Sequence, residues 1–117
     1  MKGPSPGELY WASIESEERR PIIIISRQEF NLGNYVVAIP LTSTNLDKRW
    51  SLPNCVSFKA GAFGLPKDCV AQCEAITVVE KYFIDLNTGP IGVLNGEKWR
   101  SLLHAVGYVI CAVCEPE

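Results

Sequence analysis

The sequence is poor in histidine and in net charge, and both shortages limit the chemistry it can support. His104 is the only histidine in 117 residues, which excludes acid–base mechanisms that use a pair of histidines. The formal net charge is −2 and the pI about 5.4, so the chain is not a generally basic protein. A polyanionic partner would therefore have to be held by a local cationic patch.

Long apolar segments are also missing. Residues 1–7 contain no apolar stretch of the kind found in export signals. The longest mostly apolar stretch, residues 102–113, contains His104 and is shorter than the ~20 residues that a membrane-spanning helix needs. We therefore expect a cytoplasmic protein without a membrane partner.

The cysteines predict neither a disulfide framework nor a metal site. Their number, five, is odd, and no export signal accompanies them. Cys69 and Cys73 lie in a segment that is predicted to be a strand, where they would be about 13 Å apart. Such a separation is too large for one zinc ion, because Zn–S bonds are about 2.3 Å long. We interpret the cysteines, which also include Cys55, Cys111 and Cys114, as small hydrophobic residues.

Apolar periodicity predicts a mainly β fold in one domain that spans residues 1–117. Strands are expected at 9–14, 22–25, 35–39 (ended by Pro40), 55–58, 69–79 and 91–93. Four successive isoleucines at 22–25 indicate a strand that is covered on both faces, as in a barrel wall. The apolar residues Trp99, Leu102, Leu103, Val106 and Ile110 have the spacing of one helical face, with Asn95 as N-cap. Together these patterns predict a small β-barrel with a C-terminal helix.

Two polar side chains are expected to meet at one end of this barrel. If residues 22–26 and 35–39 form an antiparallel hairpin with Ser26 opposite Tyr35, then Arg20 lies opposite Leu41. Thr42 then lies within about one residue of Arg20, and a slip of one residue would leave them neighbours. A guanidinium beside a hydroxyl is a combination suited to binding phosphate.

A second cationic segment follows the hairpin. Lys48 and Arg49 precede Trp50, a combination that can hold a nucleic-acid strand by charge and stacking. The alternative is an exposed loop in which Trp50 packs against the edge of the barrel. Lys59 and Lys67 are weaker candidates for phosphate binding, since a solvated lysine is the more common case.

Motifs spread along the chain resemble those of the MazF/PemK toxins of bacterial toxin–antitoxin pairs. They are Pro-Gly-Glu-Leu-Tyr-Trp at 6–11, Arg-Pro followed by isoleucines at 20–25, Pro-Leu-Thr-Ser at 40–43, Asp-Cys-Val-Ala at 68–71 and the closing helix at 94–110. Each motif is short, but their order and spacing together are fairly specific. The resemblance covers nearly the whole chain.

The resemblance implies an SH3-like β-barrel of the CcdB/MazF toxin type that forms a homodimer. It implies cleavage of single-stranded RNA without a metal or other cofactor, by attack of a ribose 2′-hydroxyl on the adjacent phosphate. The catalytic arginine of the family matches Arg20 and the catalytic threonine matches Thr42, while Ser43 is expected to share in RNA binding. The family also implies a protein antitoxin as partner.

The sequence departs from the family pattern at two places. A longer glycine-rich loop is replaced by a short segment with Glu15, Glu17 and Glu18, whose carboxylates would repel phosphate. A Gln-Ile-Arg stretch of the family appears as Ala75-Ile76-Thr77, which lacks the basic residue. These departures keep an alternative open: a barrel without catalytic activity that binds a protein, such as an inactive relative or a gyrase-targeting toxin.

Overall fold

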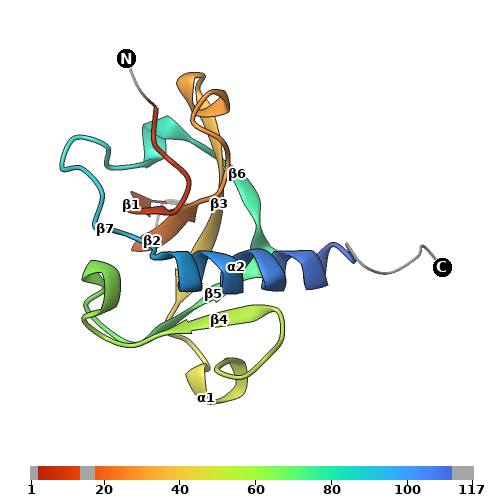
Figure 1. Ribbon diagram of the computed structural model, residues 1–117. Helices are drawn as coiled ribbons and strands as arrows, with labels where there is room; N and C mark the ends of the chain where they lie inside the picture. Colours follow the sequence, from red (N-terminus) through yellow and green to blue (C-terminus); the bar gives the residue numbers. More distant parts are fainter. Residues whose placement is uncertain (1–2, 14–17, 112–117) are drawn as a thin grey trace.

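Short antiparallel strands and one long helix make up most of the chain (Figure 1). The computed structural model describes residues 3–13 and 18–111. The strands are β1 (Glu8–Ser13), β2 (Arg19–Ile24), β3 (Tyr35–Thr42), β4 (Cys55–Phe58), β5 (Cys69–Gln72), β6 (Thr77–Glu80) and β7 (Gly92–Val93). The α-helices are α1 (Leu46–Arg49) and α2 (Gly96–Val109), and the 3-10 turns are η2 (Phe30–Leu32), η3 (Ala62–Gly64), η4 (Cys73–Ala75) and η5 (Lys81–Phe83). The prediction of a mainly β fold with a C-terminal helix is confirmed.

Strand β3 is the central strand of the sheet. The strand order is β4-β5-β3-β2-β1-β7, and β6 pairs with β3 outside this path. Along one edge β3 pairs first with β6, from Tyr35 to Ala38, and then with β5, at Leu41 and Thr42. Its other edge pairs with β2. This change of partner along one strand curls the sheet into a half-barrel.

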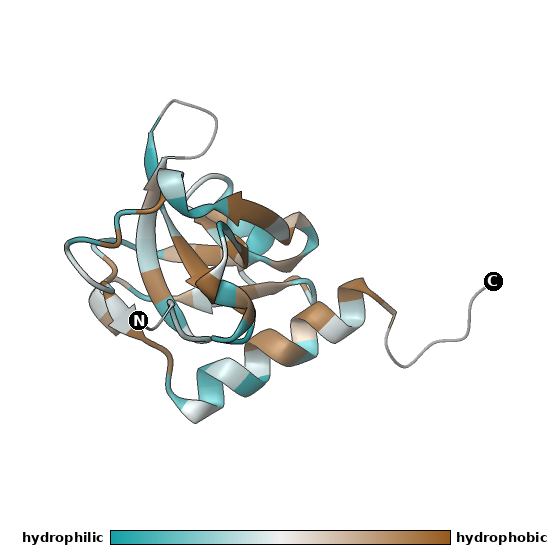
Figure 2. Cartoon of the chain, turned by 90° about the horizontal axis from the view of Figure 1, so that it is seen from above, coloured by the Kyte–Doolittle hydropathy of each residue, from teal (hydrophilic) through white to brown (hydrophobic). Residues whose placement is uncertain are grey.

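Both faces of β2 are buried, as the isoleucine run predicted. Ile23 packs with Leu9 and Ile39 in one core cluster, which α2 covers through Leu102. Ile22 and Ile24 belong to a second cluster on the opposite face, which includes Tyr10, Ala12, Val36, Ala38, Val79 and Ile84. Figure 2 shows the hydrophobic residues of the strands gathered in the interior of the half-barrel.

Helix α2 begins where the sequence predicted, and it packs through part of the predicted apolar face. The Asn95 side chain accepts a hydrogen bond from the Lys98 backbone N–H at 2.8 Å, which confirms the N-cap. Leu102 and Ala105 are buried, whereas Leu103 and Ile110 are 47% and 62% exposed. The predicted apolar face was therefore partly wrong: Trp99, Leu102 and Val106 pack in or against the core, whereas Leu103 and Ile110 are exposed and Ala105 is buried instead.

The predicted end of a strand at Pro40 was wrong, since β3 continues to Thr42. Ile25 N–H donates to the Val37 carbonyl at 3.0 Å, and alternation along the ladder then makes Ile22↔Pro40 a pair without hydrogen bonds. On its other edge Pro40 lies between the last residue paired with β6 and the first paired with β5. A proline is tolerated at this position because no partner needs its missing N–H.

The long strand predicted at 69–79 is divided in two. The turn η4 separates β5 from β6, and Cys73 lies in it rather than in an extended strand. The Ile76 N–H donates to the Cys73 carbonyl across the turn. The division allows the two halves to pair with different parts of β3. Cys69 and Cys73 are both buried free thiols, as expected, whereas Cys111 is disulfide-bonded, so the interpretation of the cysteines as small hydrophobic residues was wrong for Cys111.

We predict that two neighbouring leucines of α2 differ sharply in their effect on stability. Leu102→Ala should lower the free energy of unfolding by about 2–5 kcal/mol, because it removes a fully buried side chain from the core. Leu103→Ala should change it by about 0.5 kcal/mol or less, because Leu103 is exposed. Chemical denaturation of both variants measures the difference, and equal losses would contradict the packing described for α2.

Candidate active site at the ends of β2 and β3

The register of the β2–β3 hairpin brings Arg20 directly opposite Thr42. The observed pairs are Ile22↔Pro40, Ile23↔Ile39 and Ile24↔Ala38. Continuing this register by two residues pairs Arg20 with Thr42. The predicted register, with Arg20 opposite Leu41, was therefore wrong by one residue. The Ser26 side chain is the reason, since its hydroxyl takes the place of a backbone partner for Val37 N–H at 2.9 Å.

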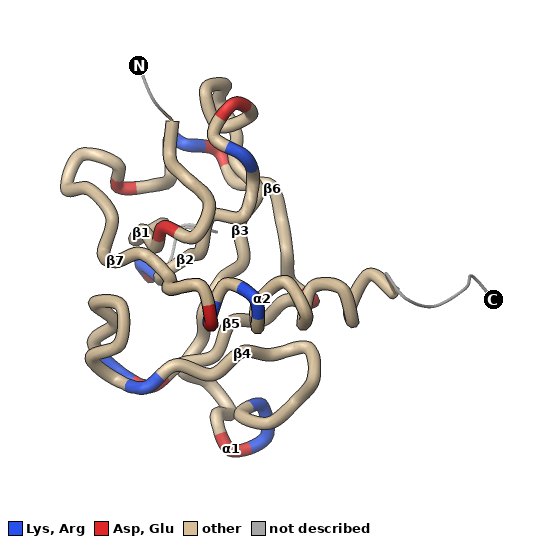
Figure 3. Tube along the Cα trace, in the orientation of Figure 1, with Lys and Arg blue, Asp and Glu red and all other residues tan. Residues whose placement is uncertain are grey.

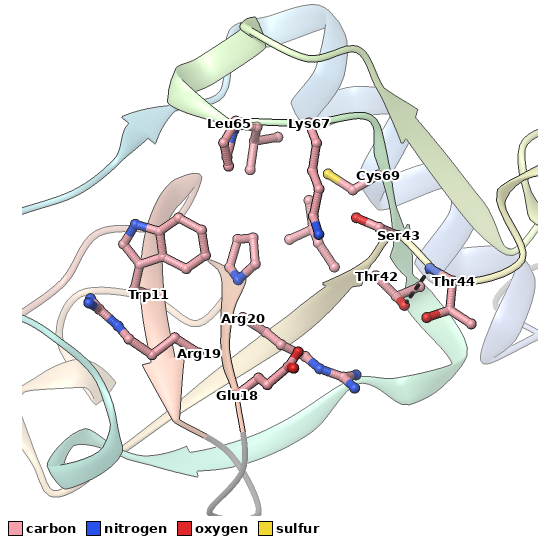
Figure 4. A pocket seen from close by; sticks show the side chains of 13 residues that line it. Trp11, Glu18, Arg19, Arg20, Thr42, Ser43, Thr44, Leu65, Lys67 and Cys69 are labelled. Carbon is pink, nitrogen blue, oxygen red and sulfur yellow. Dashed lines mark hydrogen bonds between the residues drawn. The ribbon is translucent and has the colours of Figure 1, made fainter.

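A cavity of about 460 Å³ opens at these strand ends (Figure 4). Its volume lies within the range of about 300–1,000 Å³ that is typical of small-molecule sites. Pro21, Leu41 and Leu65 give it an apolar part. Its polar and charged lining comes from Glu18, Arg19, Arg20, Thr42, Ser43, Thr44 and Lys67. Arg20, Thr42 and Ser43, which the sequence analysis predicted as site residues, thus line one cavity.

The hydroxyls of β3 are held in defined positions. Thr42 is 7% exposed, and its Oγ1 accepts a hydrogen bond from Thr44 N–H at 3.2 Å. The structure records no acceptor for the Thr42 hydroxyl proton among the described residues, so that proton can be donated to a ligand. Ser43 Oγ instead donates to the Asp68 carbonyl at 3.2 Å. Thr42 is therefore the better placed donor of the two.

Arg19 and Trp11 also line the cavity, and sequence reasoning missed both. Arg19 Nη2 lies 3.0 Å from Asp85 Oδ2, and its guanidinium lies 5.7 Å from the centroid of the Trp11 ring. Hydrogen bonds from Thr88, followed by the charge of Arg19, lower the pKa of Asp85 from its ordinary value. Arg20 makes no ion pair within 3–13 and 18–111, so its guanidinium, unlike that of Arg19, is uncommitted. In the sequence, the only sign that Arg19 belongs to the site is that it directly precedes Arg20.

The predicted RNA-binding segment lies beside the cavity rather than in it. Lys48 and Arg49 belong to α1, on which Figure 3 shows basic residues, and neither lines the cavity. Arg49 Nη1 donates to the carbonyl of Thr44, a residue that does line it, at 3.3 Å. Trp50 is half-buried, and Lys59 Nζ lies 5.2 Å from its ring centroid. Trp50 is thus partly exposed, with Lys59 against its ring and Arg49 next to it in the chain.

Cys69 contributes a neutral side chain to the cavity wall. Burial, followed by the charge of Asp68, raises the pKa of the Cys69 thiol to about 11, although the nearby Lys67 opposes the shift. The thiolate is the reactive form of cysteine, so Cys69 is not a nucleophile at neutral pH. The described part of the chain holds no group of three or more His, Cys, Asp or Glu residues that could bind a metal ion. Within the same residues, no helix is long and apolar enough to cross a membrane.

Solved structures that are similar to this fold include MazF toxins. A mycobacterial endoribonuclease in complex with its cognate antitoxin matches with a TM-score of 0.76 and 19% identity, over 97% of this chain and 99% of that one. The Mycobacterium tuberculosis toxin MazF-mt6 matches with a TM-score of 0.74 and 20% identity, over 89% and 96% of the two chains. MazF in a Deinococcus radiodurans MazE–MazF structure matches with a TM-score of 0.72 and 16% identity, over 92% and 95%. These likenesses confirm the fold.

Curated relatives and a family profile extend the likeness to the sequence. Endoribonuclease MazF6 of Mycobacterium tuberculosis and endoribonuclease MazF2 of Mycobacterium bovis are each 27% identical over 108 residues, which cover 87% of this chain and 89% of theirs. The alternative of a barrel without catalytic activity is not favoured by these relatives. The profile described as "PemK-like, MazF-like toxin of type II toxin-antitoxin system" matches residues 5–110. The chain therefore belongs to the PemK-like, MazF-like toxin family of type II toxin–antitoxin systems.

Proposed function

We propose that this toxin is an endoribonuclease that cleaves single-stranded RNA without a metal cofactor. The observation that carries the proposal is the convergence of Arg20 and Thr42 on one cavity at the ends of β2 and β3. The 2′-hydroxyl attacks the adjacent phosphorus, which leaves a 2′,3′-cyclic phosphate on one fragment and a 5′-hydroxyl on the other. The curated relatives named as endoribonucleases support this reaction class.

Arg20 and Thr42 have separate roles in this reaction. Negative charge builds up on the phosphoryl oxygens in the transition state, and donors that are already in place stabilise it. The Arg20 guanidinium is permanently charged and offers a fork of N–H donors that fits two phosphate oxygens. The Thr42 hydroxyl donates to a third oxygen or orients the 2′-hydroxyl. Arginine is a poor general base because its guanidinium is always protonated, so the role of Arg20 is electrostatic.

The RNA strand that leads to the cavity is held by α1 and by Trp50, which follows it. Lys48 and Arg49 supply charge for the RNA backbone, and the partly exposed Trp50 supplies a stacking surface. Arg49 is tied to Thr44 at the rim, so this segment continues directly into the cavity. Ser43 adds a polar contact at the rim. The protein as a whole is acidic, so these local cations are what attract RNA.

Two protein partners follow from membership of this family. Structural neighbours include MazF toxins in complex with antitoxins, and we propose a protein antitoxin and a homodimer for this chain as well. Large apolar side chains that are exposed in the isolated chain support such contacts: Tyr35, Val78, Tyr82 and Ile110 are each more than half exposed. We place this protein in the cytoplasm, where its RNA substrate is found.

The first prediction for this function concerns Arg20. Purified protein should cleave a mixed single-stranded RNA in the presence of a chelator and leave cyclic-phosphate ends. Arg20→Ala should abolish cleavage and leave thermal unfolding unchanged, because Arg20 is exposed. Arg20→Lys should retain only part of the activity, since a single ammonium lacks the fork of donors. Cleavage by folded Arg20→Ala at the wild-type rate would remove Arg20 from the mechanism.

A second prediction concerns the cations of α1. Lys48→Ala and Arg49→Ala should weaken binding of a non-cleavable RNA with a 2′-deoxyribose at the cleavage position. Each lost phosphate contact should make the slope of log K against log salt concentration less negative by about 0.7. Lys81→Ala, at η5, is the matched control and should leave the slope unchanged. Unchanged slopes in the α1 variants would place the RNA on another surface.

A further inference from the structure

Arg20 and Thr42 do not complete the proposed reaction, because two protons must also move. The attacking 2′-hydroxyl loses a proton, and the departing 5′-oxygen gains one. These oxygens lie on opposite sides of phosphorus in an in-line displacement, so the groups that serve them must approach from opposite sides. The following inference rests on the proposed RNA cleavage and assigns these two roles.

The sheet topology places one carboxylate and one ammonium on opposite sides of Thr42. Strand β3 lies between β2 and β5 in the sheet. Glu18 immediately precedes β2, and Lys67 lies in the segment that leads into β5. Both line the cavity, and Figure 4 shows Lys67 entering it from one wall and Glu18, beside Arg20, from the opposite wall. A phosphate bound at the end of β3 therefore has an acid and a base on its two sides.

Glu18 and Lys67 are both uncommitted, in contrast to their neighbours. Neither makes a hydrogen bond or ion pair to any other residue in the described part of the chain. Arg19, by comparison, is paired with Asp85, and the Asp68 carboxylate accepts a hydrogen bond from Ala60 N–H at 2.7 Å. Side chains that are exposed to a cavity and free of partners can bind a ligand without breaking an existing contact.

The other titratable groups around the cavity do not fit these roles. Arg19 and Arg20 are permanent cations. Burial keeps Cys69 in its thiol form. Asp68 and Asp85 contact the site only through Ser43 and Arg19, and neither lines the cavity. Glu18 is therefore the one carboxylate, and Lys67 the one amine, that the described residues present to a ligand in this cavity.

We propose that Glu18 is the general base and Lys67 the general acid of the cleavage reaction. The Glu18 carboxylate takes the proton of the 2′-hydroxyl as its oxygen forms a bond to phosphorus. The bond between phosphorus and the 5′-oxygen breaks, and the Lys67 ammonium gives a proton to that oxygen. Water then returns the proton from the Glu18 carboxyl to the Lys67 amine, which restores the starting state. Arg20 and Thr42 stabilise the phosphoryl charge throughout.

The base role is tested by the pH dependence of Glu18→Gln. The wild-type single-turnover rate should fall at acidic pH, because a protonated base is inactive. Glu18→Gln should be slower at neutral pH by about 100-fold or more, the lower range for loss of a general base. The rate of Glu18→Gln should also not fall at acidic pH. A slow variant that keeps this fall would show that Glu18 only positions other groups.

The acid role is tested with a modified leaving group. Lys67→Met should cleave ordinary RNA about 100-fold or more slowly than wild type. It should cleave RNA that carries a 5′-sulfur at the scissile bond at a rate close to wild type, because a thiolate departs without a proton. If Lys67→Met is equally impaired on both substrates, Lys67 binds phosphate but does not act as an acid.

Control variants separate this inference from the proposed function. Glu80→Gln on β6 and Lys81→Met at η5 make the same chemical changes outside the cavity and should leave the rate unchanged. Intact RNA with the wild-type protein would overturn the proposed function itself. Cleavage that requires Arg20 but proceeds at the wild-type rate in Glu18→Gln and Lys67→Met would overturn only the acid–base assignment.

Discussion

The hydrogen bonds that hold β2 to β3 determine which residues of these two strands face each other at the cavity. Ser26 Oγ accepts from Val37 N–H at 2.9 Å and is itself bonded to the Asn31 side chain. Asn31 is fully buried, and its amide donates to the carbonyls of Pro4 and Ser26 at 2.7 and 2.8 Å. A hairpin shifted by one residue would break this network, at a cost of about 1–3 kcal/mol for each buried polar group left without a partner. Burial of the isoleucines cannot set the register alone, because both faces of β2 are apolar.

Strand β3 places the residues fixed by this register at the cavity. It changes partner from β6 to β5 near Pro40, and its last residues lie between β2 and β5. The start of β2 brings Arg20 to one side of Thr42, and the approach to β5 brings Lys67 to the other. Four separate segments of the chain line this cavity, at Trp11, 18–21, 41–44 and 65–67 with Cys69, and β3 lies between two of them.

The sequence was most informative where a pattern is local. The strand at 55–58, the N-cap at Asn95 and the burial of both faces at 22–25 depend on nearby residues, and each was predicted correctly. The register failed by one residue because a side chain, Ser26, replaces a backbone partner there. The turn at Cys73 and the contacts of Arg19 could not be predicted, because they depend on which distant strand or loop becomes a neighbour. The resemblance correctly indicated the family from motifs that are individually weak.

The charge balance inside the cavity differs from that of the whole chain. The acidic segment before β2 was expected to repel phosphate, and its residues 15 and 17 lie outside the described part of the chain. Glu18 does line the cavity, together with three cations, of which Arg19 is partly neutralised by Asp85. Arg20 and Lys67 remain to attract a phosphate against a single negative charge. A carboxylate in such surroundings does not prevent anion binding, and it is placed where a proton must be removed.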